Sequence, residues 1–226
     1  MKGFQSIWEE LRKEGKQIAR FPYDKVISFV FRYYPKEKEK TEIKILEVGC
    51  GAGNNLWALA LEGFDVYGID GSETAIKLAN DIFNKFGTKG NFYIQDFTKP
   101  FPFNDEIFDL IIDRGSITCI DIKDAQKTFK EIYRVLKTGG YFFFNPYSTK
   151  HFTYLSSTTK KTEKYVLTEK GSIAGTGFVC FYDIQDIEKL LDSNKWEVFE
   201  MREVTIEDKI NQENLHSEWE VIVKKK

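Results

Sequence analysis

Acidic and amide side chains end five apolar runs of this chain, at positions where they could bind a cationic or hydroxyl-bearing ligand. The five residues are Glu47, Asp70, Asp96, Asp113 and Asn145. The apolar runs alternate with helical patterns, which predicts a parallel sheet built from right-handed crossovers. Because ligands bind at the carboxyl ends of such strands, we expect these side chains to converge on one site.

A turn with three glycines follows the first apolar run. Gly49, Gly51 and Gly53 indicate backbone with positive φ or close approach of a ligand. The dinucleotide pattern requires a small residue where Asn54 stands, and no Gly-Lys-Ser/Thr follows to form a P-loop. Glu47, just before the turn, repels phosphates and stabilises an ammonium. The turn therefore favours a ligand with a positive centre.

The segment Glu47–Gly53 resembles the E-x-G-x-G-x-G motif of class I S-adenosylmethionine-dependent methyltransferases. Four later segments resemble the family in the same order: Phe64–Asp70, Phe92–Phe97, the "fDl" strand Phe108–Asp113, and the "RvLkpGG" segment Glu131–Phe144, in which Thr138 stands where proline is usual. The resemblance implies S-adenosyl-L-methionine as cofactor. It also implies an α/β, Rossmann-like, doubly wound seven-stranded sheet, mostly parallel with an antiparallel last strand. The helical spacing of apolar residues from Phe4 to Leu11, and a second helical pattern that begins at Pro22, predict a helical N-terminal cap of two helices.

The resemblance also implies which residues contact the cofactor. Asp70 is expected to accept the ribose hydroxyls, and Asp96 to take the adenine amino group beside an apolar wall at Phe97. Alternatively, Asp70 or Ser72 begins a helix and Asp96 begins a turn. Arg20 lies in an aromatic, basic linker that either covers the site or packs two helices together. The candidates are Glu47, Gly49, Gly51, Gly53, Asp70, Gly71, Ser72, Asp96, Phe97, Asp113 and Arg20.

Methyl transfer from a sulfonium depends mainly on holding the nucleophile about 3 Å from the carbon and in line with the leaving sulfur. A base is needed for a hydroxyl acceptor and is less important for a neutral amine. His151 is the candidate base, although it fits a surface loop equally well. Asp113 and Arg114 are expected to contact the methionine part or the acceptor, and Arg114 suits an acidic or phosphorylated acceptor. His216 is interpreted as structural.

The sequence says least about the molecule that accepts the methyl group. Asn145-Pro146-Tyr147 is similar to the N-P-P-Y motif of enzymes that methylate planar amino groups, but it follows the fifth strand and lacks one proline. We therefore expect a hydroxyl or amine of a small metabolite, with sugars and phosphorylated compounds as candidates. Two alternatives stay open: an NAD-dependent oxidoreductase, and a non-catalytic subunit with the methyltransferase fold.

Composition narrows the remaining classes. A net charge of −2 gives no reason to expect a nucleic-acid or membrane partner. Three widely spaced cysteines argue against disulfides and against C-x-x-C metal ligation, so no metal is expected. No segment approaches the ~20 apolar residues of a membrane span, and a cytoplasmic location is expected. The oligomeric state stays open.

The chain is expected to form a single methyltransferase domain, residues 1–226. Its four parts are a helical N-terminal cap (1–40), a cofactor-binding half (41–145), a substrate-side insertion or lid (146–182), and a C-terminal helix and hairpin (183–226). Helices are expected near 54–62, 72–86, 124–136 and 183–191. The last two strands are expected near 196–204 and 219–223.

Overall fold

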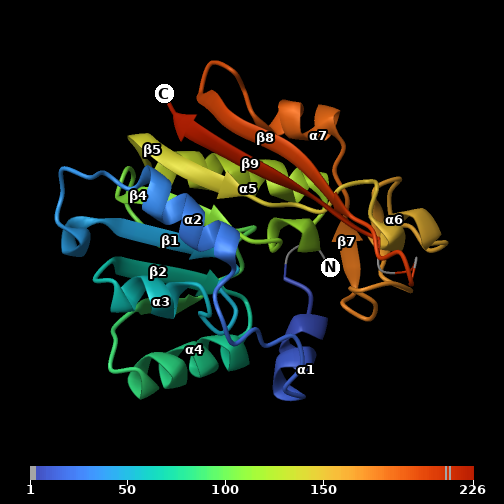
Figure 1. The fold of residues 1–226 in the computed structure, drawn as a ribbon, viewed down its shortest axis with the longest axis horizontal. Coiled ribbons are helices and arrows are strands. Elements are labelled where there is room, and N and C mark those ends of the chain that lie inside the picture. The colour runs from blue at the N-terminus through green and yellow to red at the C-terminus, as the bar shows by residue number, and fades with distance from the viewer. Residues whose placement is uncertain (1–3, 212, 214) are drawn as a thin grey trace.

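A seven-stranded sheet forms the centre of the computed structural model, which describes residues 4–211, 213 and 215–226 (Figure 1). The strand order is β3-β2-β1-β4-β5-β9-β8. Strands β1 to β5 are parallel, whereas β9 is antiparallel to both of its neighbours. The strands are β1 (Lys44–Val48), β2 (Asp65–Asp70), β3 (Asn91–Ile94), β4 (Phe108–Asp113), β5 (Leu136–Phe144), β8 (Trp196–Ile206) and β9 (His216–Lys225). The expected doubly wound sheet with an antiparallel last strand is confirmed.

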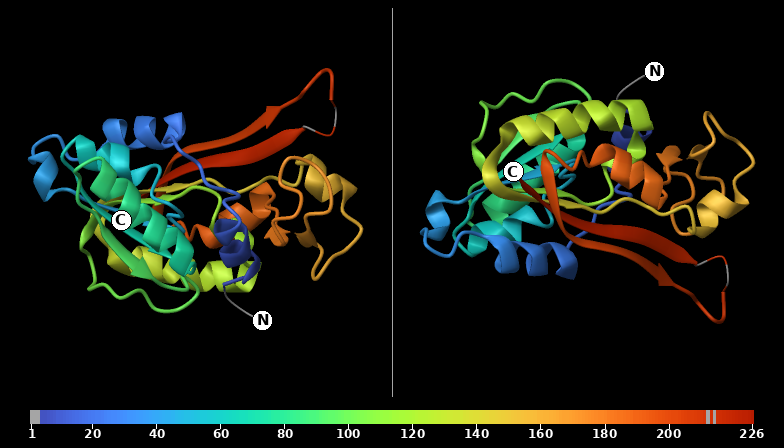
Figure 2. Two further views of the ribbon diagram at one scale, coloured as in Figure 1. Left: turned by 90° about the horizontal axis from the view of Figure 1, so that it is seen from below. Right: turned by 90° about the horizontal axis from the view of Figure 1, so that it is seen from above.

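Helices cover both faces of the sheet because its buried strands present apolar side chains alternately to each side. Ile45 packs with the helices on one face and Leu46 with those on the other. The first face carries α2 (Asp24–Tyr33), α3 (Leu56–Leu61) and α4 (Glu73–Lys85); the second carries α5 (Ile122–Val135) and α7 (Ile184–Leu190). Figure 2 shows α2 and α5 on opposite sides of the sheet. The helices expected from the sequence are found within two residues of their predicted bounds.

The insertion contains secondary structure that the sequence pattern does not reveal. A short helix, α6 (Phe152–Ser156), precedes a two-stranded antiparallel sheet of β6 (Tyr165–Leu167) and β7 (Phe178–Cys180). Strands of three residues are too short to show a periodicity. The insertion and the β8–β9 hairpin extend beyond the central sheet on the same side of the molecule (Figure 2).

The two expected cap helices occupy different places. Helix α2 packs on the sheet through Val26, Phe29 and Val30, whereas α1 (Ile7–Lys13) lies at the carboxyl ends of the strands, beside the start of α4. A short 3₁₀ turn, η1 (Lys40–Glu42), leads into β1. Positions 1–3 of the expected cap, and positions 212 and 214 of the expected hairpin, lie outside the described residues. No helix among the described residues is long and apolar enough to cross a membrane.

Asp109 in β4 ties the amino-terminal ends of the strands together. Its carboxylate is almost fully buried and accepts hydrogen bonds from Lys38 Nζ (2.9 Å), Lys137 Nζ (2.8 Å) and the Lys44 N–H (3.0 Å). Burial alone would raise the pKa of Asp109, but these hydrogen bonds outweigh it and lower the pKa. The contribution to stability is therefore present above the ordinary pKa of aspartate and is lost as the pH falls.

Replacing this carboxylate should destabilise the fold. We expect Asp109→Ala to lower the free energy of unfolding by about 1.5–3 kcal/mol, the range for hydrogen bonds to a charged group. Urea denaturation at neutral pH measures the effect. The matched control is Asp105→Ala, since Asp105 is 72% exposed in its pair with Arg134 and should change stability by less than about 0.5 kcal/mol. Equal effects of the two substitutions would contradict the role of Asp109.

Candidate active site

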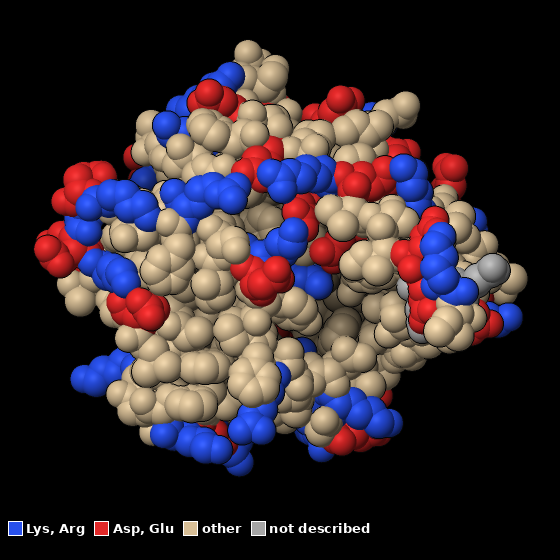
Figure 3. Space-filling view, viewed as in Figure 1, with Lys and Arg blue, Asp and Glu red and all other residues tan. Residues whose placement is uncertain are grey.

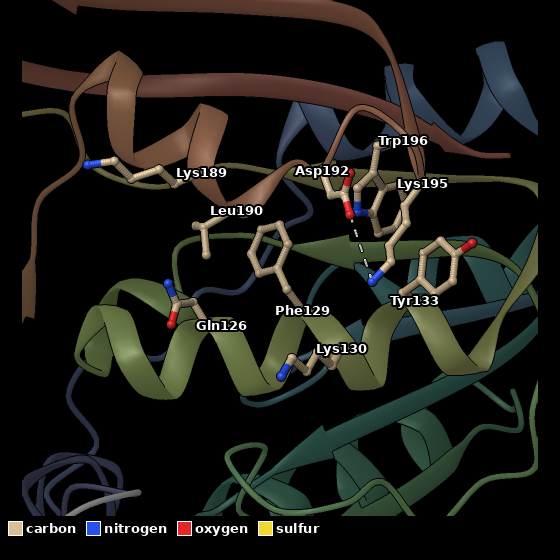
Figure 4. A pocket seen from close by; sticks show the side chains of 9 residues that line it. All are labelled: Gln126, Phe129, Lys130, Tyr133, Lys189, Leu190, Asp192, Lys195 and Trp196. Carbon is tan, nitrogen blue, oxygen red and sulfur yellow. Dashed lines mark ion pairs between the residues drawn. The ribbon is translucent and has the colours of Figure 1, made fainter.

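A cavity of about 110 Å³ lies at the carboxyl ends of the central strands, where the sequence predicts the site. It opens on the face that Figure 3 shows hollowed beside α1. Its walls come from the N-terminal segment, the strand ends and the loop after β4: Phe4, Gln5, Trp8, Arg12, Gly49, Asp70, Phe97, Arg114, Gly115, Ser116, Cys119 and Ile120. A wider cavity of about 290 Å³, between α5 and α7, is lined by none of the expected site residues (Figure 4).

The glycine turn is packed too tightly at Gly49 for a side chain there. Gly49 has φ +68°, and a Cβ there would lie 2.2 Å from the Cβ of Ser116. The Gly49 and Cys50 N–H groups donate to the Ile69 carbonyl, and the Gly51 N–H donates to Asp70 Oδ2 at 2.9 Å. These bonds hold the turn after β1 against the end of β2, so the turn and Asp70 form one rigid unit.

Glu47 and Asp113 each present one buried carboxylate oxygen without a hydrogen-bond partner among the described residues. Glu47 Oε1 accepts from Asn55 Nδ2 at 2.6 Å, which leaves Oε2 unpaired. Asp113 Oδ1 accepts from the N–H groups of Ser116 (3.0 Å) and Ile117 (2.9 Å), which leaves Oδ2 unpaired. Asn145 Oδ1, at the end of β5, is also buried and unpaired. Three predicted strand-end groups therefore carry unpaired acceptor atoms, although none of the three is among the described residues that line the cavity.

Burial of these carboxylates raises their pKa values. Burial raises the pKa of Glu47 to about 8, and the neighbouring charges of Asp113 and Asp70 add to the effect. Burial likewise raises the pKa of Asp113 to about 6, against the hydrogen bonds from Ser116 and Ile117. Unpaired carboxylates in a site of low polarity attract a cationic ligand, because a nearby positive charge restores the stability of the ionised form.

Asp70, Gly71 and Ser72 lie where β2 meets α4. The Asp70 carboxylate accepts the N–H groups of Gly51 and Ser72, both at 2.9 Å, and burial raises its pKa. Ser72 Oγ begins α4 by accepting the Ala75 N–H at 3.0 Å, so the alternative role of Ser72 as a helix cap is realised. Asp70 also lines the cavity and is placed to accept hydroxyl donors.

Asp96 and Phe97 are neighbours in the sequence but lie in different surroundings. Phe97 lines the cavity as the expected apolar wall. Asp96 instead organises the turn after β3, accepting from the Thr98 N–H (2.9 Å) and from Thr98 Oγ1 (2.7 Å). Asp96 is not among the described residues that line the cavity, so its predicted contact with adenine requires a ligand that reaches beyond the cavity wall.

Arg114 lines the cavity. Its guanidinium lies 4.3 Å from the ring centre of Tyr23, in a cation–π contact, and 3.4 Å from Glu218 of β9. Only 16% of its side chain is exposed. Because Tyr23 precedes α2 and Glu218 lies in the hairpin, Arg114 connects the N-terminal linker with the C-terminal part of the sheet.

His151 does not lie at the cavity, and the geometry does not support its predicted role as a base. It is fully buried among the rings of Tyr147, Phe181 and His216, and its Nδ1 accepts the Thr153 N–H at 3.1 Å at the start of α6. Burial lowers its pKa to about 4, so the imidazole is neutral near pH 7. The sequence could not show this because a short helix cap and a loop histidine have the same local pattern.

Arg12, rather than Arg20, is the basic N-terminal residue at the cavity. Arg20 is exposed and contacts only the ring of Phe21, at 5.4 Å, among the contacts found in the described part of the chain. Arg12 lies on the same face of α1 as Trp8, four residues earlier, and both line the cavity. This spacing was the available signal for Arg12 in the sequence.

The chain belongs to a family of methyltransferase domains, whose model matches residues 39–197. It is 29% identical to a putative methyltransferase of Bacillus subtilis over 148 residues, which cover 65% of this chain and 55% of that protein. Over 65% of this chain it also resembles a tRNA N(3)-methylcytidine methyltransferase of Schizosaccharomyces pombe (27% identity, 48% of that protein) and phosphoethanolamine N-methyltransferase 1 of Arabidopsis thaliana (30% identity, 31% of that protein). The chain spans about half the length of the first curated relatives it matches.

The fold agrees with this family. A solved S-adenosylmethionine-dependent methyltransferase of Methanosarcina mazei superposes with a TM-score of 0.73 at 23% identity, covering 91% of this chain and 98% of that chain. The expected methyltransferase family is confirmed by the matching family model. The family does not support the alternative of an NAD-dependent oxidoreductase.

The residues present fit the expected cofactor, S-adenosyl-L-methionine, in charge, but the cavity is too small for it as it stands. Its sulfonium and ammonium groups match the free oxygens of Glu47 and Asp113, and Phe97 offers an apolar wall. The cavity of about 110 Å³ is smaller than the roughly 300–1,000 Å³ of ligand pockets. Phe4 lies directly over Gly71, where a Cβ would be 2.3 Å from its ring. The side chains of Phe4 and Trp8 must therefore shift when the cofactor enters.

The raised pKa of Glu47 predicts how stability depends on pH. Its folded pKa of about 8 exceeds the ordinary ~4.3 of glutamate, so the contribution of Glu47 to stability is fully present below that ordinary pKa and is lost as the pH rises through 8. We expect this contribution to fall by about 2 kcal/mol between pH 6 and pH 8 in the ligand-free protein. Glu47→Gln keeps an acceptor for Asn55 and should flatten this dependence. Urea denaturation across the range measures both curves, and parallel curves would refute the assignment.

Proposed function

We propose that the protein is an S-adenosylmethionine-dependent methyltransferase that transfers a methyl group to a hydroxyl or amine of a small metabolite. One observation carries the proposal: two buried carboxylates, Glu47 and Asp113, keep free oxygens beside a glycine turn at the carboxyl ends of β1 and β4. A neutral ligand would do nothing to offset the cost of ionising these buried groups. A sulfonium cofactor with an ammonium group offsets that cost.

The residues divide between binding and orientation. S-adenosylmethionine supplies an electrophilic methyl group when bound. Glu47 and Asp113 hold the positively charged part, Asp70 accepts hydroxyl donors, and Phe97 excludes water from one side. This arrangement favours catalysis by proximity, since the acceptor atom needs only to be held in line with the methyl group.

The acceptor side favours a small, acidic compound. Arg114 lines the cavity with its guanidinium fixed between Tyr23 and Glu218, a position suited to a carboxylate or phosphate group. The N-terminal segment and the residues after β4 restrict the opening. Sugars and phosphorylated compounds are therefore the first candidates. The near-neutral net charge of −2 gives no support for a tRNA acceptor, although one relative bears the name of a tRNA methyltransferase.

The remaining expectations belong to the same proposal. We infer that neither a nucleic acid nor a membrane is a partner, and that the protein acts in the cytoplasm. Among the described residues, no group of three or more His, Cys, Asp and Glu side chains is arranged to hold a metal ion. A metal-independent transfer is therefore the simplest form of the reaction.

Cofactor choice is tested by direct binding. We expect saturable binding of S-adenosylmethionine in isothermal titration calorimetry and none of NAD. Asp70→Ala should weaken binding by about 1–3 kcal/mol, because charge-assisted hydrogen bonds to the ribose are lost. Asp81→Ala, an exposed change on α4, serves as the control and should leave the affinity unaltered. NAD binding without S-adenosylmethionine binding would overturn the proposal.

The acceptor is identified by mass spectrometry. The protein, S-adenosylmethionine and pools of sugar nucleotides, phosphorylated metabolites and small amines should yield a product heavier by one methyl group. For an acidic acceptor, Arg114→Met should raise the KM by roughly 10-fold or more, since a charged hydrogen bond is lost, while cofactor affinity changes little. His151→Ala should reduce stability more than turnover. Selective loss of turnover in that variant would restore His151 as the base.

A further inference from the structure

Arg12 carries a partly buried positive charge that contacts the ring of Trp8, 5.8 Å from its centre, and forms no ion pair with an acid among the described residues. Its Nη1 atom is buried without a hydrogen-bond partner among the described residues. Its Nη2 atom lies 3.1 Å from the place a Cβ at Gly51 would occupy. The guanidinium thus lies directly over the glycine turn and forms part of the cavity wall.

The nearby acids are already engaged with other groups. Asp70 contributes favourable electrostatics to Arg12, yet its two oxygens accept backbone N–H groups from Gly51 and Ser72. Glu9, one turn earlier on α1, bonds to the start of α4 instead. A partly buried guanidinium with an unpaired nitrogen is costly for the fold. An anionic ligand group at the cavity would remove that cost.

The positive and negative groups beside the glycine turn lie at different places, and this arrangement selects a ligand with the complementary charges. Free carboxylate oxygens of Glu47 and Asp113 mark the strand ends, and the guanidinium of Arg12 lies over Gly51. An α-amino acid group carries the complementary pair, an ammonium and a carboxylate on one carbon. We propose that Arg12 binds the α-carboxylate of S-adenosylmethionine, an inference that rests on the proposed function.

Two other residues of the N-terminal segment position Arg12. Glu9 accepts from Ser72 Oγ at 2.6 Å and from Thr74 Oγ1 at 2.7 Å, which anchors α1 to the start of α4. Gln5 donates to the Phe178 carbonyl at 2.8 Å and accepts the Phe178 N–H at 3.0 Å, so its amide pairs with β7 as a strand would. The N-terminal segment that carries Arg12 is therefore anchored to α4 through Glu9 and to the insertion through Gln5.

The experiment compares two ligands that differ only in the carboxylate. S-adenosylmethionine and its decarboxylated analogue are titrated by calorimetry into the wild type and into Arg12→Met. We expect the wild type to prefer S-adenosylmethionine by roughly 10–100-fold, the scale of a charged hydrogen-bonded contact, and Arg12→Met to bind both about equally. The decarboxylated compound should bind the two proteins with the same affinity, which also shows that the variant is folded.

The matched control is Lys16→Met, which removes a positive charge from the same segment at a side chain that is 65% exposed. It should keep the wild-type preference. A preference for S-adenosylmethionine that persists in Arg12→Met would overturn the role of Arg12 while leaving the proposed function intact. A wild type that binds neither compound would overturn the proposed function itself.

The positioning role of Glu9 has a separate readout. Glu9→Ala should abolish the preference for the carboxylate while preserving affinity for the decarboxylated analogue, because α1 no longer holds Arg12 over the turn. If Glu9 contributed only to the stability of the fold, the substitution would weaken the binding of both ligands equally. Equal weakening would therefore remove Glu9 from the proposal.

Discussion

Burial of two carboxylates at the ends of neighbouring parallel strands is the constraint around which this site is organised. Glu47 and Asp113 lie one register position apart at the ends of β1 and β4, since Asp113 pairs with Val48. No cation forms a close ion pair with either carboxylate among the described residues. Such an arrangement opposes folding, because ionised groups lose their hydration. Hydrogen bonds to one oxygen of each carboxylate offset part of that cost. The second oxygen of each carboxylate has no such bond and is free for a ligand.

Asn55 extends this constraint to the N-terminal segment. Its Nδ2 donates to Glu47 at 2.6 Å, and its Oδ1 accepts the Tyr23 N–H at 2.9 Å. Asn54 donates to the Phe21 carbonyl at 3.0 Å. Two amides that follow the glycine turn therefore fix the linker between α1 and α2, and Tyr23 in turn supports Arg114. The carboxylate of Glu47 and the guanidinium of Arg114 therefore belong to one connected network of contacts.

The sequence predicts the fold well because each element has a strong local signal. Buried runs ending in acids predict β1, β2 and β4, and the alternation with helical patterns predicts their order. The same logic predicts that Glu47, Asp70 and Asp113 lie together, since carboxyl ends of parallel strands share one edge. Nothing local distinguishes Asp96, which holds a turn, from Asp70, which lines the cavity.

Long-range contacts account for what the sequence could not predict. The choice of Arg12 over Arg20 depends on how α1 docks against α4, and the burial of His151 depends on contacts with β9 and with the end of β7. The strands β6 and β7 pair across an intervening loop, and each alone is too short to show a pattern. These features arise from pairings between distant segments, whereas periodicity reports only on neighbours.

The difference between the two cap helices explains how a site with so small a cavity can admit a cofactor. Helix α2 buries Val26, Phe29 and Val30 against the sheet, but no residue of α1 is fully buried. Hydrogen bonds from Ser72 and Thr74 to the carboxylate of Glu9 hold α1 on α4. Phe4 and Trp8 are only partly buried, so their side chains can move aside while these bonds stay in place. Entry of the cofactor therefore does not require α1 to leave α4, and Arg12 stays over the glycine turn.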